Sequence, residues 1–342
     1  MHRRHVLSLL TLFLCSLLVT VGCSSSPEVT SPGPTDSGPP VVIGYSNWAG
    51  WWPWAIAEEE GLFAKHGANV ELKWFDNYTK SMEALAAGQL DGNCQTLNDT
   101  ISFAGNAVKG EVVVLVNDNS AGNDKIIVSK EINSIEDLKG KTVAVEEGVV
   151  DDYLLSLALA EKGLKRDDIK IKGLPTDQAA TAFAAGQVDA VGAFPPFWSI
   201  ALQREGSKEL ISSKDFPGAI PDLLVVTQTL IDERPKQVQA LVNTWFDILK
   251  FMEANPDKAD QIMAKRAAVG VKEFQQFKAG TRMFTLADNL EAFSPGDNRK
   301  HMPFAAQEMA KFMVDVGFIP KAPDLTKLFD DRFVKAYAAS QT

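Results

Sequence analysis

Short apolar runs alternate with amphipathic segments along the chain after residue 40. The runs Val41–Tyr45, Asn69–Trp74 and Gln89–Cys94 have the length of strands, and the helical spacing of apolar residues favours helices at Trp54–Lys65 and Thr79–Ala87 between them. A regular β-α-β-α-β order with short loops predicts a parallel or mixed sheet with helices packed on it.

A six-residue motif occurs twice. Ala86-Ala87-Gly88-Gln89-Leu90-Asp91 recurs as Ala184-Ala185-Gly186-Gln187-Val188-Asp189. In each copy we expect the glycine to end a helix in the left-handed conformation, with a strand starting directly after it. The second copy follows a strand at 142–145, a helix at 151–162 and a strand at 169–174, so the repeat predicts two α/β lobes of similar plan.

Two connections between these lobes are predicted. The strand Val112–Val116 leads through residues 117–123 into the strand Lys125–Ser129, and the strand Pro221–Thr227 precedes a long amphipathic helix at 235–254. We interpret these as two crossings, with the C-terminal helices returning to the first lobe.

The predicted fold is therefore α/β with two lobes joined by a two-crossing hinge. Lobe I comprises residues 41–120 and 222–342, and lobe II comprises residues 121–221. Ligands of such folds bind in the crevice at the carboxyl ends of the strands, where the lobes meet.

The residues before the folded body predict export. Arg3 and Arg4 precede an uncharged apolar run at 6–21, which is short for a membrane span and typical of a signal peptide over residues 1–22. The run ends in a permissive lipobox that would place a lipid on Cys23; ordinary signal cleavage is the alternative. Residues 23–40 are rich in Ser, Pro, Thr and Gly and predict a flexible tether. We expect a periplasmic protein, anchored by lipid to the extracytoplasmic face of a bacterial membrane.

Composition excludes several functions. The formal net charge is −10 at pH 7, which argues against binding to nucleic acid or to an anionic bilayer. Apart from Cys15 and Cys23 the chain has only Cys94, so we expect no disulfide framework and a buried core thiol. His66 and His301 alone remain after the signal, which leaves little for histidine-based catalysis or metal binding. No catalytic residue, metal or cofactor is expected.

The chain resembles the periplasmic-binding-protein superfamily, in particular its nitrate/sulfonate/bicarbonate or NMT1/THI5-like branch. The resemblance lies in segments spread over the body: Ile43-Gly44-Tyr45, residues 57–67, Ala87-Gly88-Gln89-Leu90-Asp91, residues 137–145, residues 185–190, Arg234-Pro235 and Asn255-Pro256-Asp257. It implies delivery of a small polar solute to an ABC permease and its ATPase. Catalytic relatives of this fold, the thiamine-pyrimidine synthases, rely on His and Cys residues that this chain lacks, so an enzyme is not expected.

Residues after the predicted strands are expected to face the crevice. Four Trp lie between residues 48 and 54, and a Trp ring either stacks on a planar solute or cation or packs in the lobe. The candidate ligand-binding residues are Asn47, Trp48, Trp51, Trp52, Gln95, Asn98, Asp99, Glu146, Glu147, Phe194, Phe197, Trp198 and Asp222, of which Trp48, Asp99, Glu146 and Asp222 are the leading contacts.

The acidic loop after the strand at 142–145 bears on the ligand. Anion-binding members of the resembling family have small or hydroxyl residues here, where a helix N-terminus holds the anion. This chain has Glu146, Glu147, Asp151 and Asp152, whose charges would repel an anion and attract a cation. The alternatives are that Asp151, Asp152 and Asp99 cap helices and that Glu146 or Glu147 points to solvent.

These observations favour a monomeric solute receptor that closes over guanidine or a similar small cation or amide, because a guanidinium group binds carboxylates in bidentate fashion and stacks on Trp. The alternative ligands are nitrate, bicarbonate or an alkyl sulfonate such as taurine. A ligand-sensing subunit of a signalling protein is the alternative from another class.

Overall fold

The computed structural model describes residues 38–341, which lie within one compact unit, residues 32–342. The predicted signal peptide, Cys23 and nearly all of the predicted tether lie outside the described residues. Within the described range, no helix combines the length and the apolar character that a membrane crossing needs.

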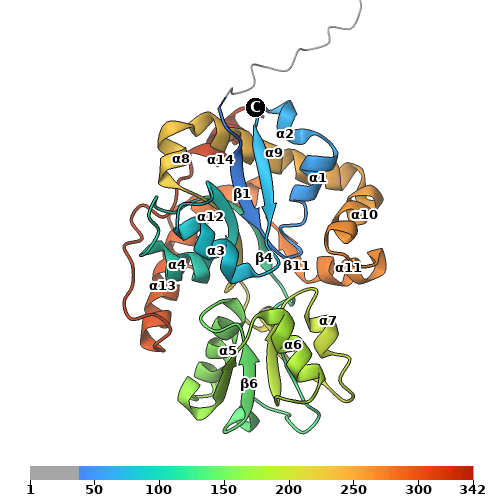
Figure 1. The fold of residues 1–342 in the computed structure, drawn as a ribbon. Helices are drawn as coiled ribbons and strands as arrows, with labels where there is room; N and C mark the ends of the chain where they lie inside the picture. Colours follow the sequence, from blue (N-terminus) through green and yellow to red (C-terminus); the bar gives the residue numbers. More distant parts are fainter. Residues whose placement is uncertain (1–37, 342) are drawn as a thin grey trace, which may run out of the picture. The chain divides into compact units, whose positions relative to one another are not determined.

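The chain forms one α/β segment, then a second, and then a long helical segment (Figure 1). The first contains β1 (Val41–Tyr45), α1 (Trp54–Glu59), α2 (Leu62–Lys65), β2 (Val70–Trp74), α3 (Tyr78–Ala86), β3 (Gly92–Thr96), α4 (Leu97–Ala104) and β4 (Val112–Ser120). The second contains β5 (Lys125–Val128), η1 (Glu136–Leu138), β6 (Thr142–Val145), α5 (Val150–Glu161), η2 (Arg166–Asp168), β7 (Lys170–Gly173), α6 (Thr176–Ala184), β8 (Ala190–Ala193), α7 (Trp198–Ala201), β9 (Lys208–Ser212) and η3 (Ser213–Asp215). The third contains β10 (Pro221–Val226), α8 (Gln228–Glu233), α9 (Pro235–Ala254), α10 (Pro256–Arg266), α11 (Val271–Ala279), β11 (Thr281–Met283), α12 (Leu286–Phe293), α13 (Met302–Asp315) and α14 (Arg332–Ala339).

Two mixed sheets organise these elements. The six-stranded sheet of lobe I has the order β11-β4-β10-β3-β1-β2, and the five-stranded sheet of lobe II has the order β7-β6-β8-β5-β9. In lobe I, β1 is parallel to β2 and β3, whereas β10 is antiparallel to β3 and β4. The chain crosses between the sheets at residues 121–124 and again at 216–220. This confirms the predicted two-lobed α/β fold; β10 begins at Pro221, one residue before the boundary expected at 222.

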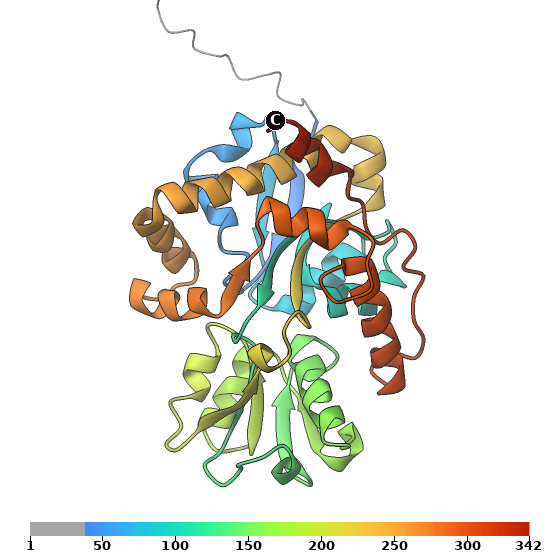
Figure 2. The same ribbon diagram turned by 180° about the vertical axis from the view of Figure 1, so that it is seen from behind.

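The C-terminal segment returns to lobe I, as expected. Helix α9 has the predicted bounds, 235–254, with Pro235 at its first turn, where a missing N–H costs nothing. It contacts α1, α2, α14 and β4, and Figure 2 shows it across the back of the lobe I sheet. The single helix predicted at 54–65 is instead two, α1 and α2, because Gly61 adopts a left-handed φ of 67° between them.

The repeated motif has the same geometry in both lobes. Gly88 and Gly186 have φ of 71° and 73° and end α3 and α6. The aspartate that closes each copy then binds another strand of its own lobe, β1 in lobe I and β6 in lobe II. Asp91 accepts a hydrogen bond from the Val42 N–H at 3.0 Å, and Asp189 accepts one from the Thr142 N–H at 2.8 Å. The expected strand start at Gln89 was therefore wrong: β3 begins at Gly92, after this aspartate contact.

The core is mainly apolar, and many of its buried polar residues lie at the ends of the strands. Cys94 is fully buried and free, as expected, and burial raises the pKa of its thiol. Strand β4 is buried over its whole length although its last four residues, 117–120, are polar. Buried polar groups without water need partners or a function, so this end of β4 is where a site is to be sought.

Candidate ligand-binding crevice

A cavity lies where the carboxyl ends of the strands of both lobes meet. It is lined by residues of lobe I, of lobe II and of the crossings: Asn47, Trp48, Trp51, Tyr78, Thr96, Asp124, Val150, Phe194 and Asp222. Its volume is about 10 Å³, which is on the order of the space that one water molecule needs. A second hollow shares Asn47, Tyr78 and Phe194 with it and adds Glu146 and Phe197. A solute larger than water would therefore need the lobes to part before it entered.

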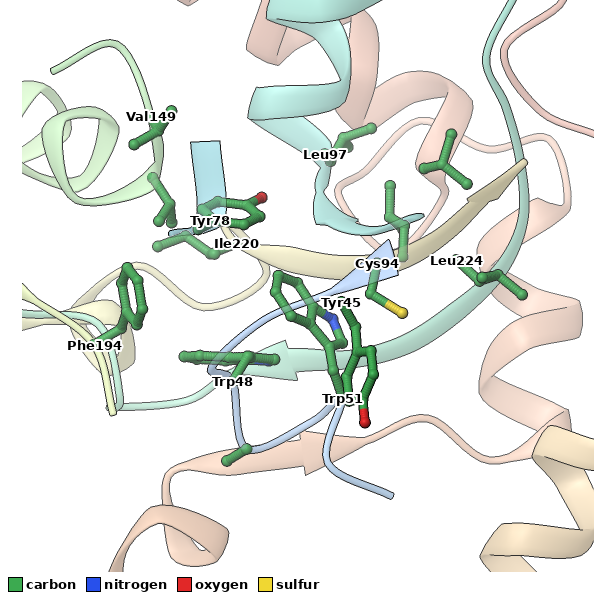
Figure 3. Packing of buried hydrophobic residues seen from close by; sticks show 14 of the residues in the cluster. Tyr45, Trp48, Trp51, Tyr78, Cys94, Leu97, Val149, Phe194, Ile220 and Leu224 are labelled. Atoms are coloured by element: carbon green, nitrogen blue, oxygen red, sulfur yellow. The ribbon is translucent and has the colours of Figure 1, made fainter. Parts of the chain in front are cut away.

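Aromatic rings form one wall of this cavity (Figure 3). The ring centroids of Trp48 and Trp51 are 6.3 Å apart, those of Trp51 and Tyr78 are 5.4 Å apart, and those of Tyr78 and Phe194 are 6.3 Å apart. The row thus runs from lobe I to Phe194 of lobe II. Contacts at these distances are those of interacting rings, and their faces suit a planar or cationic ligand.

Strand register brings two carboxyl groups together at this edge. Asp222, near the start of β10, pairs with Asp118 of β4 on one side and with Thr96 of β3 on the other. Because β10 is antiparallel to both neighbours, its first residues lie beside their last ones. Asp124 reaches the same place from the first crossing, since it directly precedes β5.

Five aspartates are buried in and around this cavity. Asp99, Asp118 and Asp151 are 0% exposed, and Asp124 and Asp222 are 1% exposed. Both carboxyl oxygens of Asp151 and of Asp222 lack a hydrogen-bond partner among the described residues. Carboxyl groups this deeply buried are costly unless they are protonated or a cation neutralises them.

The pKa values show how the carboxyl groups respond to one another. Burial is the largest cause for all five, and it raises the pKa of Asp99, Asp118 and Asp124 to about 7 each. The pKa of Asp151 is raised well above its ordinary value by burial and then by the charges of Asp124 and other acidic neighbours. The pKa of Asp222 is raised in the same way, by burial and then by Asp118 and Asp124. These carboxyl groups therefore resist ionisation in the crevice as long as no cation is close to them.

The nearest cation is already engaged. Lys125 lowers the pKa of Asp124, but its Nζ lies 2.5 Å from a Glu209 carboxyl oxygen and 5.3 Å from the centroid of the Trp198 ring. Trp198 itself packs against Phe277, with centroids 5.1 Å apart, and does not line the cavity. Lys125 therefore compensates the acidic cluster only in part.

Glu146 joins the lobes instead of lining the main cavity. One carboxyl oxygen accepts hydrogen bonds from the Thr79 hydroxyl at 2.5 Å and from the Asn77 amide at 3.4 Å, both in lobe I. The other accepts from the Thr176 hydroxyl at 2.8 Å and the Thr176 N–H at 3.3 Å, both in lobe II. Both oxygens are thus occupied by protein.

Two further sequence candidates, Trp52 and Gln95, lie away from the cavity. Trp52 is fully buried between Phe274 and Phe277, with both centroid distances 6.0 Å. Gln95 donates to Thr100 and Glu111 inside lobe I. Side chains along a β-strand alternate between the two faces of the sheet, so Gln95 and Thr96 point in opposite directions. Thr96 is the one that lines the cavity.

The acidic residues at the start of α5 also differ in their surroundings. Glu147 is mostly exposed and is ion-paired with Arg166, which also binds Asp152. Asp152 additionally accepts from the Gly148 N–H at 2.9 Å in the loop before α5, although the N-cap of this helix is Val149. Asp151 makes no such bond and is fully buried.

Asp99 has partners of its own. It accepts from the Thr96 hydroxyl at 2.7 Å and from the Asn98 amide at 2.7 Å, in the first turn of α4. Thr96, not Asp99, is the N-cap of that helix. Asn98 and Asp99 are both fully buried, next to the cavity residue Thr96.

The sequence interpretation missed Tyr78, Asp118 and Asp124. Asp118 and Asp124 lie in and beside the segment that was assigned only as a connection between lobes, residues 117–123. Polar residues that end an apolar strand before a crossing were the available signal. Tyr78 gave none, because its place in the crevice depends on how α3 packs.

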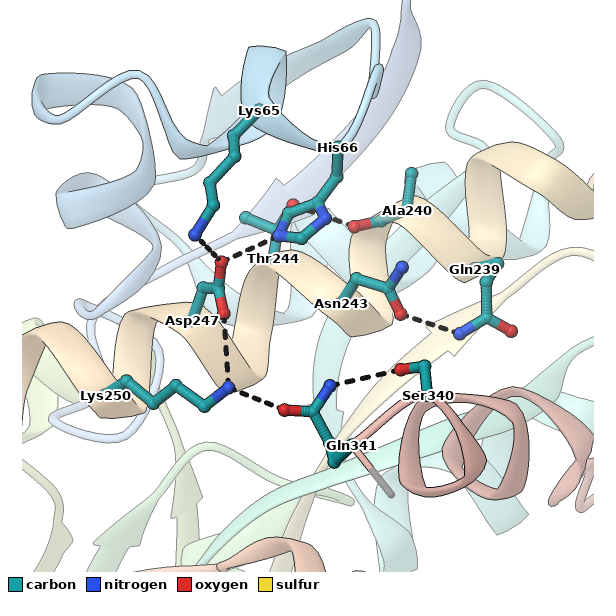
Figure 4. Close-up of polar contacts among 10 residues, drawn as sticks. All are labelled: Lys65, His66, Gln239, Ala240, Asn243, Thr244, Asp247, Lys250, Ser340 and Gln341. Carbon is teal, nitrogen blue, oxygen red and sulfur yellow. Dashed lines mark hydrogen bonds and ion pairs between the residues drawn. The ribbon is translucent and has the colours of Figure 1, made fainter. Parts of the chain in front are cut away.

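Other chemistry is sparse in the described residues. No group of three or more His, Cys, Asp or Glu among residues 38–341 has the arrangement that holds a metal ion. His66 bonds Asp247 of α9 at 2.8 Å, in a surface cluster with Lys65 and Lys250 (Figure 4). This cluster shares no residue with the cavity.

Comparison with known sequences gives a family match and named relatives. The sequence profile of the NMT1-like family matches residues 36–268. A Brucella abortus protein named as a binding protein is 32% identical over 231 residues, which are 66% of this chain and 71% of the relative. The taurine-binding periplasmic protein of Escherichia coli is 27% identical over 296 residues, 83% of this chain and 89% of that protein.

Solved structures share the fold. The periplasmic nitrate-binding protein NrtA from Synechocystis PCC 6803 matches with a TM-score of 0.71 and 14% identity, covering 89% of each chain. The desulfurization enzyme DSZB matches with a TM-score of 0.62 and 15% identity, covering 88% of this chain and 99% of the enzyme. Identities this low show the fold alone, and this fold carries both receptors and an enzyme.

Proposed function

Because this chain belongs to the NMT1-like family, we propose that it is the solute-binding subunit of a bacterial ABC importer and that it captures a small nitrogen-rich cation. Its relatives named as binding proteins and its two-lobed fold support the receptor role. In this role the lobes close over the solute, and the closed form is presented to a permease with its ATPase.

The observation that supports a cationic solute is the set of buried carboxyl groups that Lys125, already paired with Glu209, compensates only in part. Asp222 lines the cavity with both oxygens unpartnered, and Asp124 lines it with one oxygen unpartnered. A bound cation would stabilise the ionised form of these carboxyl groups, whereas a bound anion would disfavour it further.

Guanidinium fits the chemistry of this crevice best. It is planar and presents N–H donors along its edges, which match carboxylate oxygens, while its face stacks on aromatic rings. The cavity offers the oxygens of Asp124 and Asp222 together with the ring wall of Trp48, Trp51 and Tyr78. A related small cation or amide would use the same groups.

The second candidate is a solute with an anionic group: nitrate, bicarbonate or an alkyl sulfonate such as taurine. Relatives and structural neighbours named for aliphatic sulfonates, taurine and nitrate favour it. The crevice opposes it: Glu146 occupies the loop after β6, and Asp151 lies in the first turn of α5. A helix N-terminus attracts an anion, but a buried carboxylate in its first turn cancels that attraction.

The periplasmic location and the lipid anchor at Cys23 belong to the same proposal. The taurine-binding relative is named as periplasmic, and the signal-like residues 1–22 support export. A signalling subunit would use the same crevice with a membrane sensor as partner, and the gene neighbourhood would separate it from an importer.

Thermal unfolding with matched solutes tests the ligand. The protein beginning at residue 38 is melted with guanidinium, urea, taurine, nitrate or bicarbonate at millimolar concentrations; urea has the shape of guanidinium without its charge. At a concentration of 100 times its Kd, guanidinium should raise the free energy of unfolding by roughly 2.7 kcal/mol. Stabilisation by taurine or nitrate but not by guanidinium would contradict the cation proposal.

Two variants separate the site from its surroundings. Asp222→Asn removes a cavity carboxylate and should abolish most of the stabilisation by guanidinium. Glu147→Gln removes an exposed carboxylate near the start of α5 and is the matched control, for which no change is expected.

A further inference from the structure

Asp118 and Asp222 are paired across the sheet but have different surroundings. The Trp48 indole N–H donates to Asp118 at 3.0 Å, so this carboxyl group holds the ring in the cavity wall. The loop also approaches Asp118 through Gly50, where a Cβ would lie 1.8 Å from the Asp118 Oδ2 atom. Asp222 has neither contact, and of the two carboxyl groups it is the one that lines the cavity.

We propose that Asp222 releases a proton when the cation binds. In this proposal Asp118 is a positioning residue: it fixes Trp48, and when no cation is bound it accepts a hydrogen bond from the protonated Asp222 carboxyl group. This inference rests on the proposed function, because it assumes that the solute is a cation. It adds a regulation of the same site: capture is coupled to the release of a proton.

The groups that face Asp222 all favour its protonated form. They are Asp118 on β4, Asp124 in the first crossing and Asp99 on α4; the neighbouring Cys94 thiol on β3 is held neutral by burial. Burial raises the pKa of Asp222 well above its ordinary value, and these carboxylates, Asp118 first among them, raise it further. The bond from Trp48 acts oppositely on Asp118 and lowers its pKa.

The exchange balances without another reactant. In the ligand-free crevice the Asp222 carboxyl group carries the proton. The arriving cation brings one positive charge, the O–H bond of Asp222 breaks, and the proton leaves to the solvent buffer. The crevice keeps its net charge, so a buried site gains no uncompensated charge on binding.

Calorimetric titration with guanidinium chloride measures this proton directly. At pH 7 the binding enthalpy is recorded in buffers with low and high ionisation enthalpies, and its dependence on the buffer gives the number of protons released. We expect release on the order of one proton, and an affinity that falls by up to roughly tenfold for each pH unit of acidification in the range where the exchange operates.

Asp118→Asn separates positioning from a merely structural role. The amide oxygen still accepts from the Trp48 indole, but the charge beside Asp222 is lost. Binding should persist, with fewer protons released and with the pH profile of affinity displaced to lower pH. A variant that changes affinity equally at every pH would overturn the role of Asp118.

The remaining outcomes are distinct. If guanidinium binds with an enthalpy that is independent of the buffer, the proton exchange is refuted and the proposed function stands. If guanidinium fails to bind while taurine or nitrate binds, the proposed function fails first. The wild-type titrations decide the exchange even if Asp118→Asn is unfolded, which circular dichroism would reveal.

Discussion

The contact between Glu146 and Thr79 should set how readily the lobes close. Its oxygen atoms are 2.5 Å apart, and Thr79 belongs to lobe I while Glu146 belongs to lobe II. Thr176 holds the other Glu146 oxygen from within lobe II, so Glu146 stays positioned when the lobes part. Thr79→Val removes the shorter of the two hydrogen bonds from lobe I, leaves the one from the Asn77 amide at 3.4 Å, and nearly preserves the size of the side chain.

The cost follows from the kind of bond that is lost. A hydrogen bond to a charged group contributes about 1.5–3 kcal/mol net of hydration. Glu146 is 7% exposed, so water cannot readily replace the donor in the closed form. The ratio of closed to open molecules should therefore fall roughly 10- to 100-fold in Thr79→Val. Thr79→Ser keeps the hydroxyl and is the matched control.

Single-molecule energy transfer between one dye on each lobe measures this ratio with and without guanidinium. Cys94 is fully buried and should not compete for labelling. Because the solute selects the closed form, the apparent affinity of Thr79→Val should fall with its closed population, while the bound closed form keeps the same dye distance. Equal closed populations in Thr79→Val and Thr79→Ser would refute the reasoning.

Three further outcomes are expected. Burial raises the pKa of Asp99, Asp118 and Asp124 from an ordinary value of 3.8 to about 7, so between these values the folded protein holds protons that the unfolded chain has released. The free energy of unfolding without ligand should therefore fall as pH rises from about 4 to about 7. Melting temperatures that rise steadily over pH 5 to 7 would contradict this. Gly50→Ala should destabilise the protein and weaken guanidinium binding because its Cβ would meet Asp118 at 1.8 Å, whereas Gly105→Ala, with no atom within 4 Å, should change neither in the same melts. Asp91→Ala should lower the free energy of unfolding by about 1 kcal/mol through loss of the bond to Val42, as measured by urea unfolding, and an unchanged midpoint would show that water replaces that bond.

Periodicity was sufficient for the fold because burial and strand length leave a direct trace in the sequence. The strand at 142–145 and the helix at 235–254 occur with the predicted bounds. The predicted bounds were wrong where a backbone conformation or a side-chain contact overrides the local pattern. Gly61 divides a helix, and Asp91 delays β3 by bonding to a neighbouring strand, which no local window contains.

The candidate site was predicted in its position and only partly in its members. Trp48, Trp51, Phe194 and Asp222 line the cavity because each follows, or begins, a strand at the carboxyl edge. Trp52 was assigned to the same surface, but the turn of the chain between Trp51 and Trp52 directs it into the core. Neighbouring residues in a turn have no fixed period, so sequence cannot assign their faces.

The pairing of Asp118 with Asp222 depends on register between strands more than one hundred residues apart. Each aspartate alone is an ordinary polar residue at a strand end, and only the antiparallel alignment of β10 with β4 makes the two adjacent. Adjacency is what changes their chemistry: one buried carboxylate is ion-paired or protonated, whereas two adjacent ones favour a shared proton. A cation that enters such a pair must displace that proton or accept a smaller electrostatic gain. Selectivity for positive charge and the pH dependence of binding therefore have the same structural origin. A variant that abolishes either of these two properties should weaken the other.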